Sequence, residues 1–168
     1  MDKYGMKRSF WEKLKIAIIC LLIFSTVCLI SCSAPSSPDF PVPPFESNIQ
    51  WSFNGTDFSA SLSVCENSAE LRLISPDCLS GANLLVNGDT VKYTYDGITL
   101  DSVPEYYLAI MQMFRETGKF KFLCHTEIDG QNVLCYLREN TEWYFSEQTK
   151  APILAKREDI SIKILKVK

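Results

Sequence analysis

The stretch SVPEYYLAIMQMFRETG, residues 102–118, decides the fold because its apolar residues repeat with a helical period. Ser102 and Glu105 have the spacing of a capping box, and Pro104 stands near the first turn, where its missing N–H costs nothing. The glycine at the end of the stretch suits a helix stop. One face carries large apolar side chains, namely Tyr107, Leu108, Met111 and Phe114. We predict one main amphipathic helix over about residues 103–117.

On both sides of this helix, apolar and polar residues alternate, which is the period of a β-strand. In DFSASLSV, residues 57–64, one face carries Phe58, Ala60, Leu62 and Val64, and the other face carries serines. Asn87-Gly88 and Asp129-Gly130 predict hairpin turns, because both residues of each pair can adopt a positive φ. The pattern therefore predicts an α+β fold, with a curved antiparallel sheet of about eight or nine strands that holds the helix on its concave side.

The N-terminus has the pattern of a targeting segment. Residues 1–15 carry five basic and two acidic side chains, and residues 16–31 carry no charge. This apolar run is shorter than the roughly 20 residues that a membrane-spanning helix needs. A basic segment before a short apolar one is typical of a secretory signal peptide. We predict that residues 1–31 are a signal peptide that is cleaved off.

The end of the apolar run, Leu29-Ile30-Ser31-Cys32, resembles the bacterial lipobox. The resemblance implies cleavage between Ser31 and Cys32 and a diacylglycerol on the Cys32 thiol, with further acylation, for example by palmitate, on the new N-terminus. Two or three acyl chains hold a protein at a membrane surface, whereas one gives marginal binding. The alternative is that Cys32 is an ordinary cysteine that follows an uncleaved anchor. We expect a lipid anchor in the cell membrane, on its extracytoplasmic face.

Residues 32–47 predict a tether between this lipidated cysteine and the domain at residues 48–168. Five of the eight prolines of the chain lie in SAPSSPDFPVPPFES, residues 33–47. Proline removes a backbone donor and fixes φ, so the tract favours an extended spacer. Phe40 and Phe45 are unusual in a pure spacer, and we expect them to contact the domain.

Charge argues against a nucleic-acid partner. The whole chain has 17 basic and 20 acidic side chains, a net charge of −3. Because the predicted signal peptide is basic, the part after it is more acidic than the whole. A negative surface repels phosphate backbones.

The domain resembles the lipoprotein-localisation family (LolA and LolB) and spore-germination lipoproteins of Gram-positive bacteria that share its fold. The resemblance covers roughly residues 49–167. It is carried by Ile74-Ser75-Pro76-Asp77-Cys78-Leu79-Ser80-Gly81, Tyr95-Asp96-Gly97-Ile98-Thr99-Leu100 and Pro152-Ile153. It implies an unclosed β-barrel of about eleven strands that cups the helix and, in the founding members, an acyl chain. Pattern and resemblance together predict about 8–11 strands.

The residue types needed for catalysis or metal binding are scarce in this sequence. A Ser-His-Asp or Cys-His arrangement would have to use His125, the one histidine. Its neighbour Cys124 points to the opposite face of a strand. The cysteines lack the C-x₂₋₄-C spacing of a zinc site, and no glycine-rich phosphate loop occurs. We therefore expect no enzymatic activity, no metal and no cofactor.

Cys124 and Cys135 have two interpretations. If Asp129-Gly130 forms a two-residue turn, the two cysteines lie directly opposite each other, at a separation that suits a disulfide. The compartment would allow such a bond. Alternatively, both are buried small apolar side chains on a face shared with Phe122.

Aromatic and methionine side chains are the remaining candidates for a binding site. Inward-facing residues of a half-barrel can line a cavity for an apolar ligand, and the candidates are Trp51, Tyr107, Met111, Phe114 and Trp143. The alternative is that they fill the core between sheet and helix. The sequence thus favours a lipoprotein that binds a lipid or acyl chain. The second hypothesis is an interaction module that positions or stabilises a partner protein in the envelope, for example in germination or cell-wall processes. The oligomeric state is left open.

Overall fold

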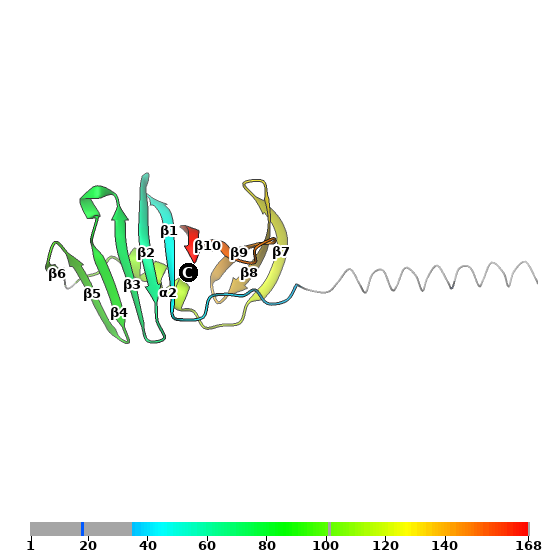
Figure 1. Ribbon diagram of the computed structural model, residues 1–168, viewed down its shortest axis with the longest axis horizontal. Helices are drawn as coiled ribbons and strands as arrows, with labels where there is room; N and C mark the ends of the chain where they lie inside the picture. Colours follow the sequence, from blue (N-terminus) through cyan, green and yellow to red (C-terminus); the bar gives the residue numbers. More distant parts are fainter. Residues whose placement is uncertain (1–17, 19–34, 101, 168) are drawn as a thin grey trace, which may run out of the picture. The chain divides into compact units, whose positions relative to one another are not determined.

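A computed structural model describes residues 18, 35–100 and 102–167 (Figure 1). The chain divides into two compact units, residues 1–36 and 37–168. Cys32 and, apart from Ile18, the predicted signal peptide lie outside the described residues. Within the described part of the chain, no helix is both long enough and apolar enough to cross a membrane.

The second unit is built on one antiparallel sheet of 11 strands, in the order β6-β5-β4-β3-β2-β1-β11-β10-β9-β8-β7 (Figure 1). The strands are β1 Phe45–Phe53, β2 Thr56–Val64, β3 Ser68–Ser75, β4 Asn83–Asn87, β5 Thr90–Tyr95, β6 Ile98–Leu100, β7 Lys121–Ile128, β8 Gln131–Arg138, β9 Thr141–Ser146, β10 Pro152–Arg157 and β11 Ile160–Val167. A short 3₁₀ helix, η1 Asp77–Leu79, follows β3, and one α-helix, α2 Glu105–Arg115, follows β6. The predicted curved, unclosed half-barrel with one helix is confirmed.

The sheet contains more strands than the alternation pattern predicts. β6 has three residues, too few to display a period. β10 begins at Pro152, where proline is tolerated because the first residue of a strand can lack a ladder donor. β1 begins at Phe45, so the sheet includes three residues that precede the predicted domain start at residue 48.

Tight two-residue turns connect several hairpins. Asp129 and Gly130 both have positive φ and lie between the paired residues Ile128 and Gln131, as predicted. The turn near Asn87 differs by one residue from the prediction. Asn87 pairs with Thr90, so the turn residues are Gly88-Asp89 rather than Asn87-Gly88. The pairing of β4 with β5 fixes this register, and the dipeptide alone does not reveal it.

Helix α2 is shorter than predicted at both ends. It begins after Pro104, and no side chain caps its first turn, so the expected capping box from Ser102 does not form. At its other end, the backbone of Glu116 is extended (φ −57°, ψ 135°), so the chain leaves the helix before Gly118. The buried residues of α2 are Ile110, Met111, Met113 and Phe114.

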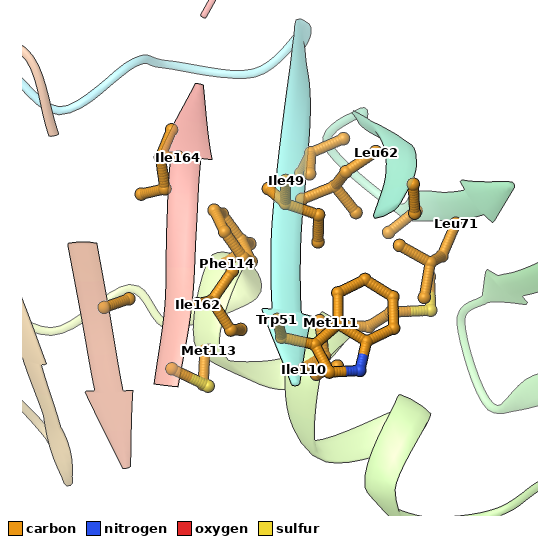
Figure 2. Close-up of a cluster of buried hydrophobic side chains, with 14 of the residues drawn as sticks. Ile49, Trp51, Leu62, Leu71, Ile110, Met111, Met113, Phe114, Ile162 and Ile164 are labelled. Carbon is orange, nitrogen blue, oxygen red and sulfur yellow. The ribbon is translucent and has the colours of Figure 1, made fainter. Parts of the chain in front are cut away.

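These helix residues pack onto the inward-facing side chains of the central strands, as Figure 2 shows. The strand side of this core includes Ile49, Trp51, Leu62, Leu71, Ile162 and Ile164. The predicted alternation in β2 is confirmed, since Ala60, Leu62 and Val64 are buried on one face. The first strand, β1, pairs with the last strand, β11, near the middle of the sheet. The two edge strands are β6 and β7.

Candidate functional site

The candidate site is a pocket of about 440 Å³ between the proline-rich segment before β1, the end of α2 and the end of β8. We call it the linker pocket. It is lined by Phe40, Pro41, Val42, Pro43, Phe45, Val64, Cys65, Glu66, Phe114, Arg115, Glu116, Thr117 and Arg138. Its wall is therefore mainly apolar, with two basic and two acidic side chains among the lining residues.

Phe40 packs against several aromatic rings of the domain. Its ring centroid lies 4.7 Å from that of Trp143 and 5.5 Å from that of Phe120, in tilted or edge-to-face arrangements that aromatic rings favour. It also contacts the ring of Phe45 at 6.0 Å. The proline-rich segment thus packs onto the domain through Phe40, as expected from the two phenylalanines in that segment.

The guanidinium of Arg138 lies under the Phe40 ring. Its Cζ atom is 4.3 Å from the centroid of Phe40 and 4.7 Å from that of Phe120. Arg138 is only 5% exposed, although arginine is seldom buried without a full set of partners. Its Nε and Nη2 atoms are buried and have no hydrogen-bond partner.

Glu116 is the buried acidic residue of the site. Its Oε1 atom accepts hydrogen bonds from Thr141 Oγ1 at 2.8 Å and from Arg157 Nη2. Its Oε2 atom lies 3.9 Å from Arg138 Nε, the distance of a loose ion pair. Burial, with a smaller contribution from the charge of Glu139, raises the pKa of the Glu116 carboxyl and outweighs Thr141 and the two arginines, which lower it. Burial also lowers the pKa of Arg138, against the opposing charge of Glu116.

The five residues predicted to bind a ligand all belong to the core or pack against it. Trp143 is 0% exposed, and Trp51, Met111 and Phe114 are also buried. Tyr107 is partly buried and lies 6.3 Å from Trp51 between ring centroids. Among the five, Phe114 lines the linker pocket, and Trp51 borders a second, more polar pocket of about 410 Å³. Their role in ligand binding stays a prediction.

Sequence reasoning missed Arg138, Glu116 and Phe120. A signal for Arg138 was present, because it follows Leu134 and Tyr136 at a spacing of two and so occupies an inward position of β8. A charge at an inward position needs an opposite charge nearby, and Glu116, just after α2, brings its Oε2 atom to 3.9 Å from Arg138 Nε without a hydrogen bond. The sequence contains no comparable signal that Glu116 would face inward.

The two cysteines of the β7–β8 hairpin are register partners. Both thiols are free in the structure. Cys135 is buried. Its pKa is raised to about 11, mainly by this burial and to a smaller extent by the charge of the nearby Cys124. Cys124 is exposed, so the two do not form a buried pair. A bulge at Leu123 also places Phe122 opposite Tyr136, on the other face from Cys124. A disulfide stays a prediction.

The remaining candidates for chemistry lie apart from one another. His125 Nδ1 is 3.5 Å from Glu147 Oε1, and both side chains are largely exposed. His125 pairs with Leu134 and Cys124 with Cys135, so these neighbours occupy opposite faces of β7. Among the described residues, no group of three or more His, Cys, Asp or Glu side chains is arranged to hold a metal.

No family model and no curated protein matches this chain. Solved structures that are similar include an uncharacterized conserved protein from Thermus thermophilus (9% identity, 74% of this chain and 77% of that chain, TM-score 0.47). A LolA superfamily protein from Nitrosomonas europaea has 11% identity over 77% of this chain and 87% of that chain, with a TM-score of 0.44. The Pseudomonas aeruginosa MucA/MucB complex has 10% identity over 74% of this chain and 50% of that chain, with a TM-score of 0.37. Likeness at this level does not identify a family.

Proposed function

We propose that this protein is a lipid-anchored, extracytoplasmic and non-enzymatic module that binds an apolar ligand in the linker pocket. The observation that supports this function most strongly is the composition of the pocket. Phe40, Val42, Phe45, Val64 and Phe114 form an apolar wall around about 440 Å³. Ligand sites are typically concave, mainly apolar and furnished with a few polar groups.

The predicted anchor would keep this pocket close to a source of apolar ligands. Phe40 is packed against the domain and lies eight residues after Cys32. A fully extended chain spans at most about 3.6 Å per residue, so the lipidated cysteine and Phe40 would lie no more than roughly 29 Å apart. A pocket at that distance could receive a ligand from the membrane or deliver one to it.

The anchor itself is tested by Cys32→Ser. Without the thiol, the lipid cannot attach, and the protein should appear in the soluble fraction or remain as an uncleaved precursor. Membrane fractionation and the intact mass of the protein distinguish these products. A variant that is still anchored and correctly cleaved would contradict the lipobox assignment.

Ligand binding is tested by native mass spectrometry of the full-length protein extracted from its own membranes. We expect an additional mass that corresponds to an acyl-chain compound. Val42→Gln should reduce the bound fraction, because it replaces an apolar side chain of the pocket wall with a polar one and adds no charge. Val42 is 81% exposed, so the fold should tolerate the change. Val91→Gln is the matched control, on an exposed apolar residue of β5 outside the pocket. A wild-type protein without bound mass would contradict the proposal.

A second function, docking of an envelope protein, is supported by a different surface. Tyr95, Ile98 and Leu100 share the concave side of β5 and β6 with Tyr93, and they stay exposed at the edge of the sheet. We call this surface the open flank. An unpaired apolar edge is suited to pairing with another chain. Crosslinking in native cells should then capture one defined partner, and Ile98→Lys should abolish that product. An unchanged product would rule out docking at this edge.

A further inference from the structure

Arg138 has hydrogen-bonding capacity that the domain does not use. A guanidinium carries five N–H donors in a planar fork. Two of its nitrogens, Nε and Nη2, are buried without a hydrogen-bond partner, and aromatic rings surround the group. Buried polar groups are nearly always hydrogen-bonded in proteins, so buried arginine nitrogens without a hydrogen bond beside a pocket indicate a missing acceptor.

The neighbouring carboxylate supplies an opposite charge but no hydrogen bond. Glu116 Oε1 accepts from Thr141 and Arg157. Its Oε2 atom has no hydrogen-bond partner and lies 3.9 Å from Arg138 Nε, beyond hydrogen-bonding distance, and Arg138 Nη2 has no partner either. Two buried or partly buried arginines therefore share one buried carboxylate. Arg115 and Glu66, which also line the pocket, carry opposite charges, and Glu139 acts on Arg138 from an exposed turn.

Phe40 covers the Arg138 guanidinium at the wall of the pocket. Its ring covers the guanidinium at 4.3 Å, a cation–π contact. The segment that carries Phe40 precedes β1, and its backbone hydrogen bond runs within the segment, from the Phe40 N–H to the Pro38 carbonyl. Phe40 can therefore leave Arg138 without breaking a hydrogen bond of the sheet ladder.

We propose that the linker pocket binds an anionic amphiphile, whose acidic group accepts hydrogen bonds from the N–H donors of Arg138 when Phe40 moves off the guanidinium. This inference rests on the proposed function, because it names the class of ligand for the same pocket. The acidic group is a carboxylate or a phosphate, since both match the guanidinium fork and both bind it more strongly than an aromatic face does. The apolar chain lies against Val42, Phe45 and Phe114.

The test is a competition measured by native mass spectrometry on the full-length lipoprotein, extracted in a non-ionic detergent and stripped of ligand. The probes are dodecanoic acid, dodecyl phosphate and dodecanol at equal concentrations, because they share one chain and differ in the head group. We expect at least one of the two anionic probes to bind about tenfold more than the alcohol, as a charge-assisted hydrogen bond to a buried group would give. The preferred anion then identifies the head group.

The outcomes separate this inference from the proposed function. Equal binding of all three probes would overturn the anionic class and leave apolar binding intact, whereas no binding of any probe would overturn both. Arg138→Gln should bring the ratio of anion to alcohol close to one, and Arg138→Lys should restore part of it. Arg72→Gln, on an exposed arginine of β3, is the matched control and should leave the ratio unchanged.

Phe40→Ala gives an independent measurement that does not alter the buried charges. If Phe40 competes with the acidic group, its removal should raise the fraction of protein with bound dodecanoic acid or dodecyl phosphate by several-fold. The fraction with bound dodecanol should rise less, because a neutral hydroxyl accepts a weaker hydrogen bond from Arg138 than an ionised group does. A fall in anion binding would contradict the role of Phe40 as a displaceable cover.

Discussion

Two regions of the same sheet differ in what lies over their concave faces. On β8 and β9, which we call the covered flank, Tyr136, Trp143 and Phe145 are almost completely buried. Their cover comes from outside the strands, since Phe40 and Phe120 both contact Trp143. On the open flank, Ile98 is 64% exposed. An inward-facing side chain of this sheet is therefore buried only where a helix or a linker lies over it.

The comparison also explains where the charges are. Glu116 comes from the end of α2 and Arg138 from the end of β8, and both are buried on the covered flank, where Phe40 of the linker segment lies over Arg138. Among its described residues, the open flank has no buried charged side chain, and its face is apolar and exposed to solvent. A buried charge needs partners, so the covered flank is the place where the fold is most sensitive to substitution.

The largest difference between the flanks should appear when one core side chain is removed from each. Trp143→Ala should lower the free energy of unfolding by about 3–5 kcal/mol, because it leaves a cavity among Phe40, Phe114 and Phe120. Ile98→Ala should change it by no more than about 0.5 kcal/mol, as expected of an exposed site. Urea unfolding of the full-length protein measures both. Similar losses would mean that the open flank is covered in solution.

A smaller loss of unfolding free energy is expected when the hydrogen bond to the buried Glu116 carboxylate is removed. Thr141 is 0% exposed and donates to Glu116 at 2.8 Å. Thr141→Val keeps the shape and removes the donor, which should cost about 1–3 kcal/mol. Thr90→Val, on the exposed first residue of β5, is the control and should be close to neutral. If urea unfolding gives equal values for the two variants, the bond to Glu116 contributes no net stability.

Phe40, which covers this part of the core, should contribute less to the free energy of unfolding than Trp143 beneath it. Phe40 is partly buried, so Phe40→Ala should lower the free energy of unfolding by about 1–2 kcal/mol. Val42→Ala, two residues further along the same segment, should be nearly silent because Val42 is 81% exposed. Thermal unfolding followed by near-ultraviolet circular dichroism would register the loss of packing around Trp143. An unchanged spectrum for Phe40→Ala would argue against the packed linker.

The sequence predicts the sheet far better than it predicts the site. The alternation of Ala60, Leu62 and Val64 and the Asp129-Gly130 turn are local signals, and the structure contains both as expected. The site depends on contacts between residues far apart in the chain, such as Glu116 with Arg157, 41 positions away. Such contacts follow from the strand order, with β10 beside β11 and β9, which no local pattern encodes.

The difference between local signals and long-range contacts also explains why the ends of α2 deviate from the prediction. The sequence predicts a helix that begins with a capping box, yet no side chain caps α2, and the chain leaves the helix at Glu116. That exit is what turns Glu116 toward Thr141 and the two arginines. Tertiary pairing therefore ends the helix where the local signal of Gly118 would have extended it.

The smallest expected effect concerns the titration of Glu116 on the covered flank. Its pKa is raised above 4.5, mainly by burial, so the folded state binds the proton more tightly than the unfolded state does. Stability from this group is then fully present below pH 4.5 and is lost as the pH rises through the folded pKa. Glu116→Gln cannot titrate. The unfolding free energy of the wild type minus that of the variant should therefore decrease as the pH rises from about 4 toward neutrality.

Urea unfolding at several pH values measures this difference, in which the contributions of the other carboxyl groups cancel. Thr141→Val provides a check of the sign, because the hydrogen bond from Thr141 lowers the pKa of Glu116. In that background the folded pKa should be higher still, and the decrease should extend to higher pH. A difference that increases with pH would mean that Arg138 and Arg157 dominate over burial. The ionised Glu116 would then neutralise the charge of Arg138, and the covered flank would have no unneutralised guanidinium to bind an acidic ligand.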